Sequence, residues 1–127
     1  MDCQDKNARD LFNRSYVECA LWSSMDESTP SGGEPMDQNH SADDIADEAK
    51  AKMTADCEAF MDANAEALKD YPASDAGHDF WLTRNHHGAG FWEVDHGTQE
   101  QCDRLTTSAH AYGECDLYVG DDGKIYV

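Results

Sequence analysis

Apolar residues recur at three- and four-residue spacing along residues 7–24, which predicts an amphipathic helix. The apolar stripe of this helix consists of Ala8, Leu11, Phe12, Tyr16, Cys19, Ala20 and Trp22. The next stretch, residues 25–40, contains two prolines and two glycines and shows no period. This composition predicts a long acidic loop rather than a further helix.

A second helical pattern begins at Ser41, which is a favourable N-cap residue. Asp43 and Asp44 would occupy its first turn, where the helix dipole favours negative charge. The buried side is expected to carry Ile45, Ala49, Met53, Cys57, Phe60 and Leu68, with Asn64 on the same stripe. Pro72 predicts the end of the segment, because it restrains the residue before it to non-helical conformations.

The pattern changes at residues 77–97, where the aromatic runs 79–82 and 91–94 flank a loop of Asn, His and Gly residues. Aromatic runs on either side of a glycine-containing loop predict a β-hairpin. The stretch holds two of the three tryptophans and four of the six histidines. We therefore expect the rest of the chain to be organised around it.

Residues 98–113 predict a shorter helix, and residues 114–127 predict a second hairpin. Thr98 and Gln101 match a capping box, and Gly113 is well placed to end the helix. The helix is expected to bury Cys102, Leu105, Ala109 and Tyr112. Alternation in the hairpin directs Cys115, Leu117, Val119, Ile125 and Val127 inward.

These elements follow one another in the order α-α-β-β-α-β-β. An isolated two-stranded hairpin is only marginally stable in water, so both hairpins are expected to join in one antiparallel sheet. One face of that sheet would pack against about three helices and give a two-layer α+β fold. The length of 127 residues suits a single domain, residues 1–127.

Acidic residues dominate the composition, with 27 Asp and Glu against nine Lys and Arg and a net charge of −18. Residues 26–75 hold 14 of the acidic residues and three of the basic ones. Like charges repel, so nucleic acid and anionic membranes are not expected as direct partners. The expected partner is instead a basic, nucleic-acid-binding protein. Solubility or adaptation to salt would give the same composition and stays open as an alternative explanation.

Cysteine usage and hydropathy both predict a cytosolic protein. No apolar run approaches the roughly 18 residues that a membrane span needs, and the first residues lack the features of a signal peptide. The five cysteines contain no C-x-x-C pair. Four of them, Cys19, Cys57, Cys102 and Cys115, fall on positions that face the expected core, which predicts reduced, buried thiols.

The histidine-rich stretch 78–97 raises the alternative of a small metal-dependent or hydrolytic enzyme. Its side chains of types that bind zinc or iron are His78, Asp79, His86, His87, Glu93, Asp95 and His96. No H-E-x-x-H or similar helical spacing supplies two ligands on one face. Neither a G-x-S-x-G elbow nor a P-loop occurs. We therefore assign no catalytic residue, metal or cofactor, and do not expect an enzyme.

Several strings of residues are distinctive: 20–24 (ALWSS), 78–85 (HDFWLTRN), 88–92 (GAGFW) and 117–126 (LYVGDDGKIY). They resemble a family of small acidic proteins of tailed bacteriophages that are usually labelled hypothetical. Members of that family tend to carry Gly where this chain has His86, which weakens a metal pair of His86 and His87. The resemblance implies a phage-encoded protein acting in the host cytoplasm, and implies nothing about chemistry.

Nine carboxylates along the second helix and the loop before it form the candidate partner-binding surface. They are Asp37, Asp43, Asp44, Asp47, Glu48, Glu58, Asp62, Glu66 and Asp70. At a rise of about 1.5 Å per residue, acids on this helix recur roughly every 4.5 Å. Duplex DNA carries about one charge per 1.7 Å, and one strand about half that density. The helix thus approaches one strand, and nearby acids or a homodimer would raise the density further.

The hypothesis from sequence is an acidic phage inhibitor that imitates nucleic acid. It would bind and block a basic host defence protein belonging to the restriction, CRISPR or recombination machinery. An accessory phage protein with no inhibitory role is a further alternative, because acidity alone does not require a partner.

Overall fold

Helices make up most of the part of the chain that the computed structural model describes, namely residues 6–26, 34–86, 89–94 and 96–127. The six α-helices are α1 (Lys6–Ser23), α2 (Met36–Asn39), α3 (Asp47–Ala63), α4 (Ala65–Leu68), α5 (Ala73–Arg84) and α6 (Gln99–Ala111). They are joined by two 3-10 helices, η1 (Ala42–Asp44) and η2 (Phe91–Glu93). Within these residues, no helix combines the length and the apolar character needed to cross a bilayer.

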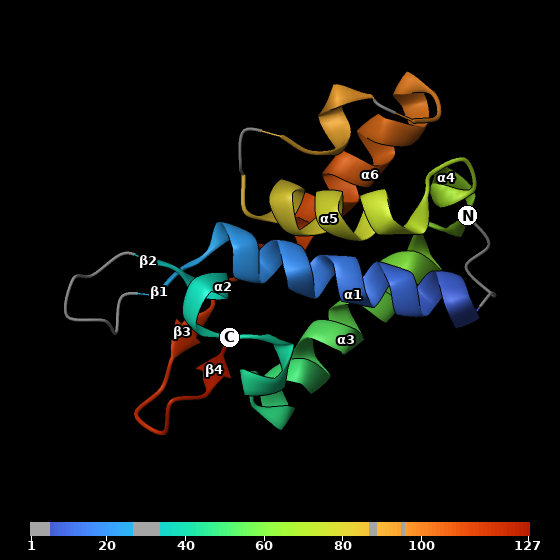
Figure 1. Cartoon of the computed structure of the whole chain (residues 1–127). Coiled ribbons are helices and arrows are strands. Elements are labelled where there is room, and N and C mark those ends of the chain that lie inside the picture. The colour runs from blue at the N-terminus through green and yellow to red at the C-terminus, as the bar shows by residue number, and fades with distance from the viewer. Residues whose placement is uncertain (1–5, 27–33, 87–88, 95) are drawn as a thin grey trace.

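The strands are short and form two separate antiparallel pairs. β1 (Met25–Asp26) pairs with β2 (Glu34–Pro35), and β3 (Tyr118–Val119) pairs with β4 (Ile125–Tyr126). Both pairs lie toward the end of α1 at which that helix finishes (Figure 1). The predicted two-layer α+β fold is therefore wrong, because the described strands build no common sheet. The last hairpin does form as predicted.

The predicted hairpin at 77–97 is replaced by α5 and η2. The buried residues of α5 include Ala73, Ala76, Gly77, Phe80, Trp81 and Arg84, which recur at helical spacing. Adjacent aromatics point to opposite faces of a strand but only about 100° apart on a helix. A helix with neighbours on two sides can therefore bury both rings. Residues 87, 88 and 95 of this stretch lie outside the described residues.

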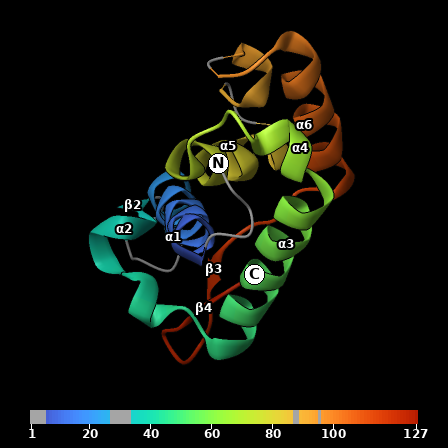
Figure 2. The ribbon, with the colours of Figure 1, turned by 90° about the vertical axis from the view of Figure 1, so that its right-hand side faces the viewer.

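Helix α5 lies between α1 and α6 (Figure 1). The contact of α5 with α1 is the most extensive between any two described elements. Viewed from the side, α1 is flanked by α2 and α3 (Figure 2). Buried side chains from all six helices belong to one hydrophobic cluster, which extends to Leu117 and Ile125 of the terminal hairpin segment.

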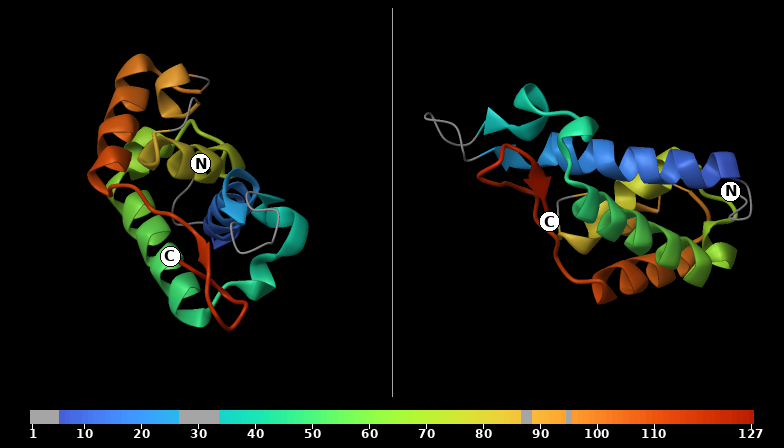
Figure 3. Two further views of the ribbon diagram at one scale, coloured as in Figure 1. Left: turned by 90° about the vertical axis from the view of Figure 1, so that its left-hand side faces the viewer. Right: turned by 90° about the horizontal axis from the view of Figure 1, so that it is seen from below.

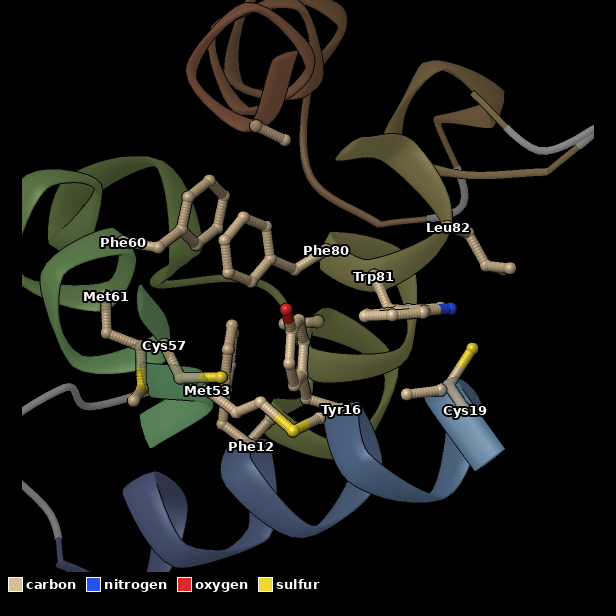
Figure 4. Close-up of a cluster of buried hydrophobic side chains, with 14 of the residues drawn as sticks. Phe12, Tyr16, Cys19, Met53, Cys57, Phe60, Met61, Phe80, Trp81 and Leu82 are labelled. Carbon is tan, nitrogen blue, oxygen red and sulfur yellow. The ribbon is translucent and has the colours of Figure 1, made fainter. Parts of the chain in front are cut away.

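Aromatic rings fill the centre of this cluster (Figure 4). Phe60 of α3 stacks on Phe80 of α5 with 4.1 Å between ring centroids and 13° between ring planes. Tyr16 of α1 meets the edge of Trp81, with centroids 5.4 Å apart. The indole nitrogen of Trp81 donates a hydrogen bond to the hydroxyl of Ser23 at 2.7 Å. The ring set thereby joins α1, α3 and α5.

Gly77 allows α1 and α5 to approach closely. A Cβ atom at this position would collide with the Phe12 carbonyl oxygen and the Ser15 hydroxyl oxygen, both on α1. The glycine lies inside α5, where it costs helix stability relative to alanine. Its presence is explained by the contact rather than by local preference.

Arg84, at the last position of α5, is a buried cation with only 2% of its surface exposed. Its Nη1 donates to Asp56 of α3 at 2.9 Å and to the Tyr16 hydroxyl of α1 at 3.0 Å. Its Nε and Nη2 donate to the carbonyl oxygens of Gly113 and Tyr112 at 2.9 and 3.1 Å. One side chain thus ties α5 to α1, to α3 and to the segment that follows α6.

Local predictions for the flanking helices have mixed outcomes. The first helix is confirmed, but its stripe is wrong for Leu11 and Trp22, whose surfaces are 42% and 62% exposed. The last helix and its capping box are confirmed: Gln101 N donates to Thr98 Oγ1 at 3.2 Å, and Thr98 N donates to Gln101 Oε1 at 2.7 Å. Gly113 follows in the left-handed region, with φ of 75°.

The predicted second helix is interrupted at Ile45 and Ala46, which are extended and separate η1 from α3. Ile45 forms a parallel bridge with Ile125, and Ala46 N donates to the Ile125 carbonyl oxygen at 2.9 Å. The buried Asn64 ends α3, and its amide donates to Phe60 O and Ser108 Oγ at 2.9 and 2.8 Å. The expected loop at 25–40 is wrong for most of its described residues, which form β1, β2 and α2, and residues 27–33 lie outside the described residues.

Replacing Gly77 by alanine tests the α1–α5 contact. We expect the free energy of unfolding, measured with urea, to fall by about 1–3 kcal/mol through overpacking. Alanine's preference for helices, up to about 1 kcal/mol, acts in the opposite direction. Ala59→Gly on the exposed face of α3 is the control and should cost about 1 kcal/mol. A more stable Gly77→Ala protein would contradict the close approach.

Arg84→Met tests the buried cation. We expect a loss of about 3–5 kcal/mol, because the change leaves Asp56 and two carbonyl groups without their buried donor. The control is Lys52→Met, which removes the other cation on Asp56, 2.6 Å away and 57% exposed. That variant should lose less than about 1 kcal/mol. Equal losses in urea titrations of the two variants would show that Arg84 has no special structural role.

Candidate functional site

The nine predicted partner-binding carboxylates are distributed over several elements. Asp43 and Asp44 lie in η1, and Asp47 and Glu48 lie in the first turn of α3. Glu58 and Asp62 lie in the second half of α3, Glu66 lies on α4, and Asp70 lies after α4. Asp37 lies on the separate helix α2, which precedes α3. Since the 17 residues of α3 span about 25 Å, its beginning and end are well separated.

Carboxylates toward the end of α3 are engaged within the chain. Arg9 of α1 forms ion pairs with both Glu58 and Asp62. Glu66 pairs with Lys69 at 3.1 Å, and Asp70 accepts a hydrogen bond from Gln101 Nε2 at 3.2 Å. These four candidates therefore hold α1, α3, α4 and α6 together or have a neighbouring cation.

Carboxylates at the start of α3 are differently placed. Asp43, Asp47 and Glu48 are exposed and make no hydrogen bond or ion pair with the described residues. Asp44 accepts from Ser41 N at 2.9 Å and lies 3.5 Å from His40 Nδ1. This end of the molecule thus presents negative charge to solvent.

The terminal hairpin adds two further carboxylates to the same end. The bridge between Ile45 and Ile125 brings strand β4 beside the start of α3, and the turn of the hairpin lies toward the same end of the molecule (Figures 2 and 3). Asp121 and Asp122 in that turn are both exposed. We call the set of six residues Asp43, Asp44, Asp47, Glu48, Asp121 and Asp122 the acidic end.

Hydrogen bonds keep one carboxylate of the acidic end ionised. Asp122 accepts from the Tyr126 hydroxyl at 2.6 Å and from Lys124 N at 3.0 Å. Its pKa is lowered by the hydrogen bond from Tyr126 and then by that from Lys124. The same bond raises the pKa of Tyr126 to about 12, so the phenol stays neutral.

Basic residues are few at the acidic end. Segments 42–50 and 120–127 contain two, Lys50 and Lys124. Lys50 lines a groove that it shares with Arg14 of α1, and Lys124 is exposed on the hairpin. Sequence analysis missed Asp121 and Asp122 because it treated residues 120–123 only as a turn. Their place depends on a contact between residues 80 positions apart, for which the sequence carries no local signal.

The histidine-rich stretch is dispersed over separate neighbourhoods. His78 lies on α5 beside Trp22, and His86 stacks on His110 with centroids 4.4 Å apart. His96 Nε2 lies 2.9 Å from Asp75 Oδ2. Of the other predicted ligands, His87 and Asp95 are outside the described residues. Among the residues that are described, no group of three or more His, Cys, Asp or Glu side chains could hold a metal ion.

A second feature that sequence analysis missed is a hollow of about 510 Å³ between α1 and α5. Glu18, Cys19 and Trp22 line it from α1, Asp75 and His78 line it from α5, and each helix adds one serine. The exposed Trp22 ring tilts over the His78 ring, with centroids 6.2 Å apart and 35° between planes. We call this the Trp22 hollow.

The one thiol in the Trp22 hollow is not set up as a nucleophile. Burial, and then the nearby Asp79 carboxylate, raise the pKa of Cys19 to about 12. The thiolate, which is the reactive form, is therefore scarce at neutral pH. The chemistry available in the hollow is binding by an aromatic face and carboxylates.

The protonation of Cys19 can be tested by alkylation. We expect iodoacetamide at pH 8 to leave Cys19 unmodified in the folded protein, because the thiol is neutral and only 1% exposed. Peptide mass spectrometry measures the labelling, and the same reaction in concentrated guanidinium chloride is the control that must label it. Rapid labelling of Cys19 in the folded protein would contradict this expectation and would show that the thiol can act as a nucleophile.

Similarity to known proteins gives no further guidance. Comparisons with protein-family models, with curated proteins and with solved structures find no match to this chain. Inference of its function therefore depends on the chemistry of the acidic end and of the Trp22 hollow.

Proposed function

We propose that this protein binds a basic, nucleic-acid-binding protein through its acidic end and competes with nucleic acid for the partner's surface. The protein acts in this proposal by binding rather than by catalysis. The observation that carries the proposal is the grouping of six carboxylates from two distant parts of the chain at one end of the molecule.

The internal ion pairs of the chain support this choice of surface. Arg9, Lys52, Lys69 and Arg84 pair with carboxylates elsewhere in the structure. At the acidic end, Asp43, Asp47 and Glu48 have no such cation among the described residues. Concentrated, uncompensated charge of one sign costs stability through repulsion. A basic partner would relieve that repulsion, which favours association.

The partner's chemistry follows from what the acidic end imitates. Phosphate groups and carboxylates both accept charge-assisted hydrogen bonds from Arg and Lys, so a nucleic-acid-binding surface can recognise either. With the resemblance to tailed-phage proteins, we propose a host protein as the partner, from restriction, CRISPR or recombination machinery. The site of action in this proposal is the host cytoplasm.

Capture from a bacterial lysate tests the proposal. The wild-type protein is compared with the triple variant Asp43→Asn, Asp47→Asn, Glu48→Gln. We expect the wild type to retain a DNA-binding protein at low salt and to release it when duplex DNA is added, because both occupy the same surface. The triple variant should bind the purified partner at least about tenfold more weakly.

A control variant carries the same change in charge elsewhere. Glu66→Gln, Asp70→Asn and Glu100→Gln neutralise three acids around a surface that also contains Lys69 and Arg104. This variant should capture the partner as the wild type does. Rising salt should weaken the wild-type complex through screening. Equal binding by both triple variants, or binding insensitive to salt, would contradict recognition by the acidic end.

A further inference from the structure

The Trp22 hollow is formed by one polar stripe from each of two helices. Glu18 and Cys19 precede Trp22 by four and three residues, so the three side chains share a face of α1. On α5, Asp75 and His78 are three residues apart and share a face in the same way. Because Gly77 brings the two helices together, the stripes lie across from each other.

Trp22 is unusual in being a large aromatic side chain that the fold leaves 62% exposed. The His78 ring of α5 lies beside it at a tilt of 35°. Burial of tryptophan is strongly favourable, and exposed tryptophans are frequent anchors of protein interfaces. The exposed ring therefore indicates a contact that the described residues do not supply.

The charge of the hollow restricts what that contact can be. Its charged lining residues are Glu18 and Asp75, and among the described residues neither Lys nor Arg lines it. Glu18 makes no hydrogen bond or ion pair with the described residues, and Asp75 is bound by the half-exposed His96. Desolvating two carboxylates under an apolar ligand would be costly, so an apolar occupant is disfavoured. A cation is favoured.

We propose that the Trp22 hollow binds an arginine side chain of the partner protein, with the guanidinium stacked on Trp22 and hydrogen-bonded to Glu18 and Asp75. A guanidinium is planar and weakly hydrated, stacks on aromatic rings and donates paired hydrogen bonds to carboxylates. An ammonium group satisfies the carboxylates but stacks less well. The inference rests on the proposed function in one respect, namely that the partner is basic.

Binding of short capped peptides tests the hollow without the partner. The probes are Ac-Gly-Arg-Gly-NH2, its lysine counterpart, and its citrulline counterpart, which keeps the shape but lacks the charge. We expect the arginine peptide to shift the Trp22 indole N–H resonance and the amides of Glu18 and Asp75, with a dissociation constant on the order of 1 mM. The citrulline peptide should cause no saturable shift.

Two variants place the binding at the hollow. Trp22→Leu and Glu18→Gln should each weaken binding of the arginine peptide by at least about fivefold. Trp92→Leu is the matched control, because Trp92 is also exposed, at 38%, but does not line the hollow. Unchanged affinity in Trp22→Leu, or equal affinity for the arginine and lysine peptides, would overturn the assignment of the hollow to a guanidinium.

The two proposals fail in distinguishable ways. Trp22→Leu should weaken binding of the captured partner, and retention of full affinity would overturn the role of the hollow while leaving the acidic end in place. The opposite result is also possible. If the arginine peptide binds the hollow but the acidic-end triple variant still captures the partner like the wild type, the assignment of the hollow is supported and the proposed function is contradicted. The triple variant at the acidic end should bind the arginine peptide as the wild type does.

Discussion

The buried guanidinium of Arg84 is the constraint on which the rest of the structure depends. A charge almost completely removed from water is tolerated only when its donors are satisfied, and here they reach Asp56, Tyr16 and two backbone carbonyls. The rings of Phe80 and Tyr112, with centroids 5.6 and 5.7 Å from the guanidinium carbon, cover it further. These partners come from α1, α3 and the segment after α6, so α5 has to lie between them. The aromatic core then fills the space that this arrangement leaves.

The acidic residues also differ in whether the fold provides them with a cation or a hydrogen-bond donor. Where α1, α4 and α6 approach the later part of α3, its carboxylates and those that follow meet Arg9, Lys69 or a side-chain amide. At the start of α3 the terminal hairpin contributes more acidic groups and the cation of Lys124, while Lys50 lines a groove with Arg14 of α1. Negative charge is consequently uneven over a molecule whose composition is acidic throughout. The surface that we propose for a partner is one part of this charge in which few carboxylates form ion pairs with the described residues.

Close helix packing creates the second proposed surface as well. Gly77 allows α1 to lie close to α5. The Trp22 hollow between these two helices contains the carboxylates of Glu18 and Asp75 beside the exposed Trp22. Both surfaces therefore combine side chains that no single element could present. Together they would provide a basic protein with a negatively charged surface and with one binding site for a guanidinium group.

Short-range signals in the sequence determined α1, α6 with its Thr98 cap, the β3–β4 hairpin, the burial of three cysteines and the net charge. Periodicity, capping and alternation act over a few residues, so they can be read locally. The prediction of a strand at residues 77–84 was wrong because the preference of aromatic residues for strands is weak. Packing of this segment between α1 and α6 stabilises a helix instead. Short-range sequence patterns could not predict which carboxylates form ion pairs either, because Arg9 and Glu58 are 49 residues apart. The tertiary structure alone determined the acidic end and the Trp22 hollow, because both depend on contacts between distant segments.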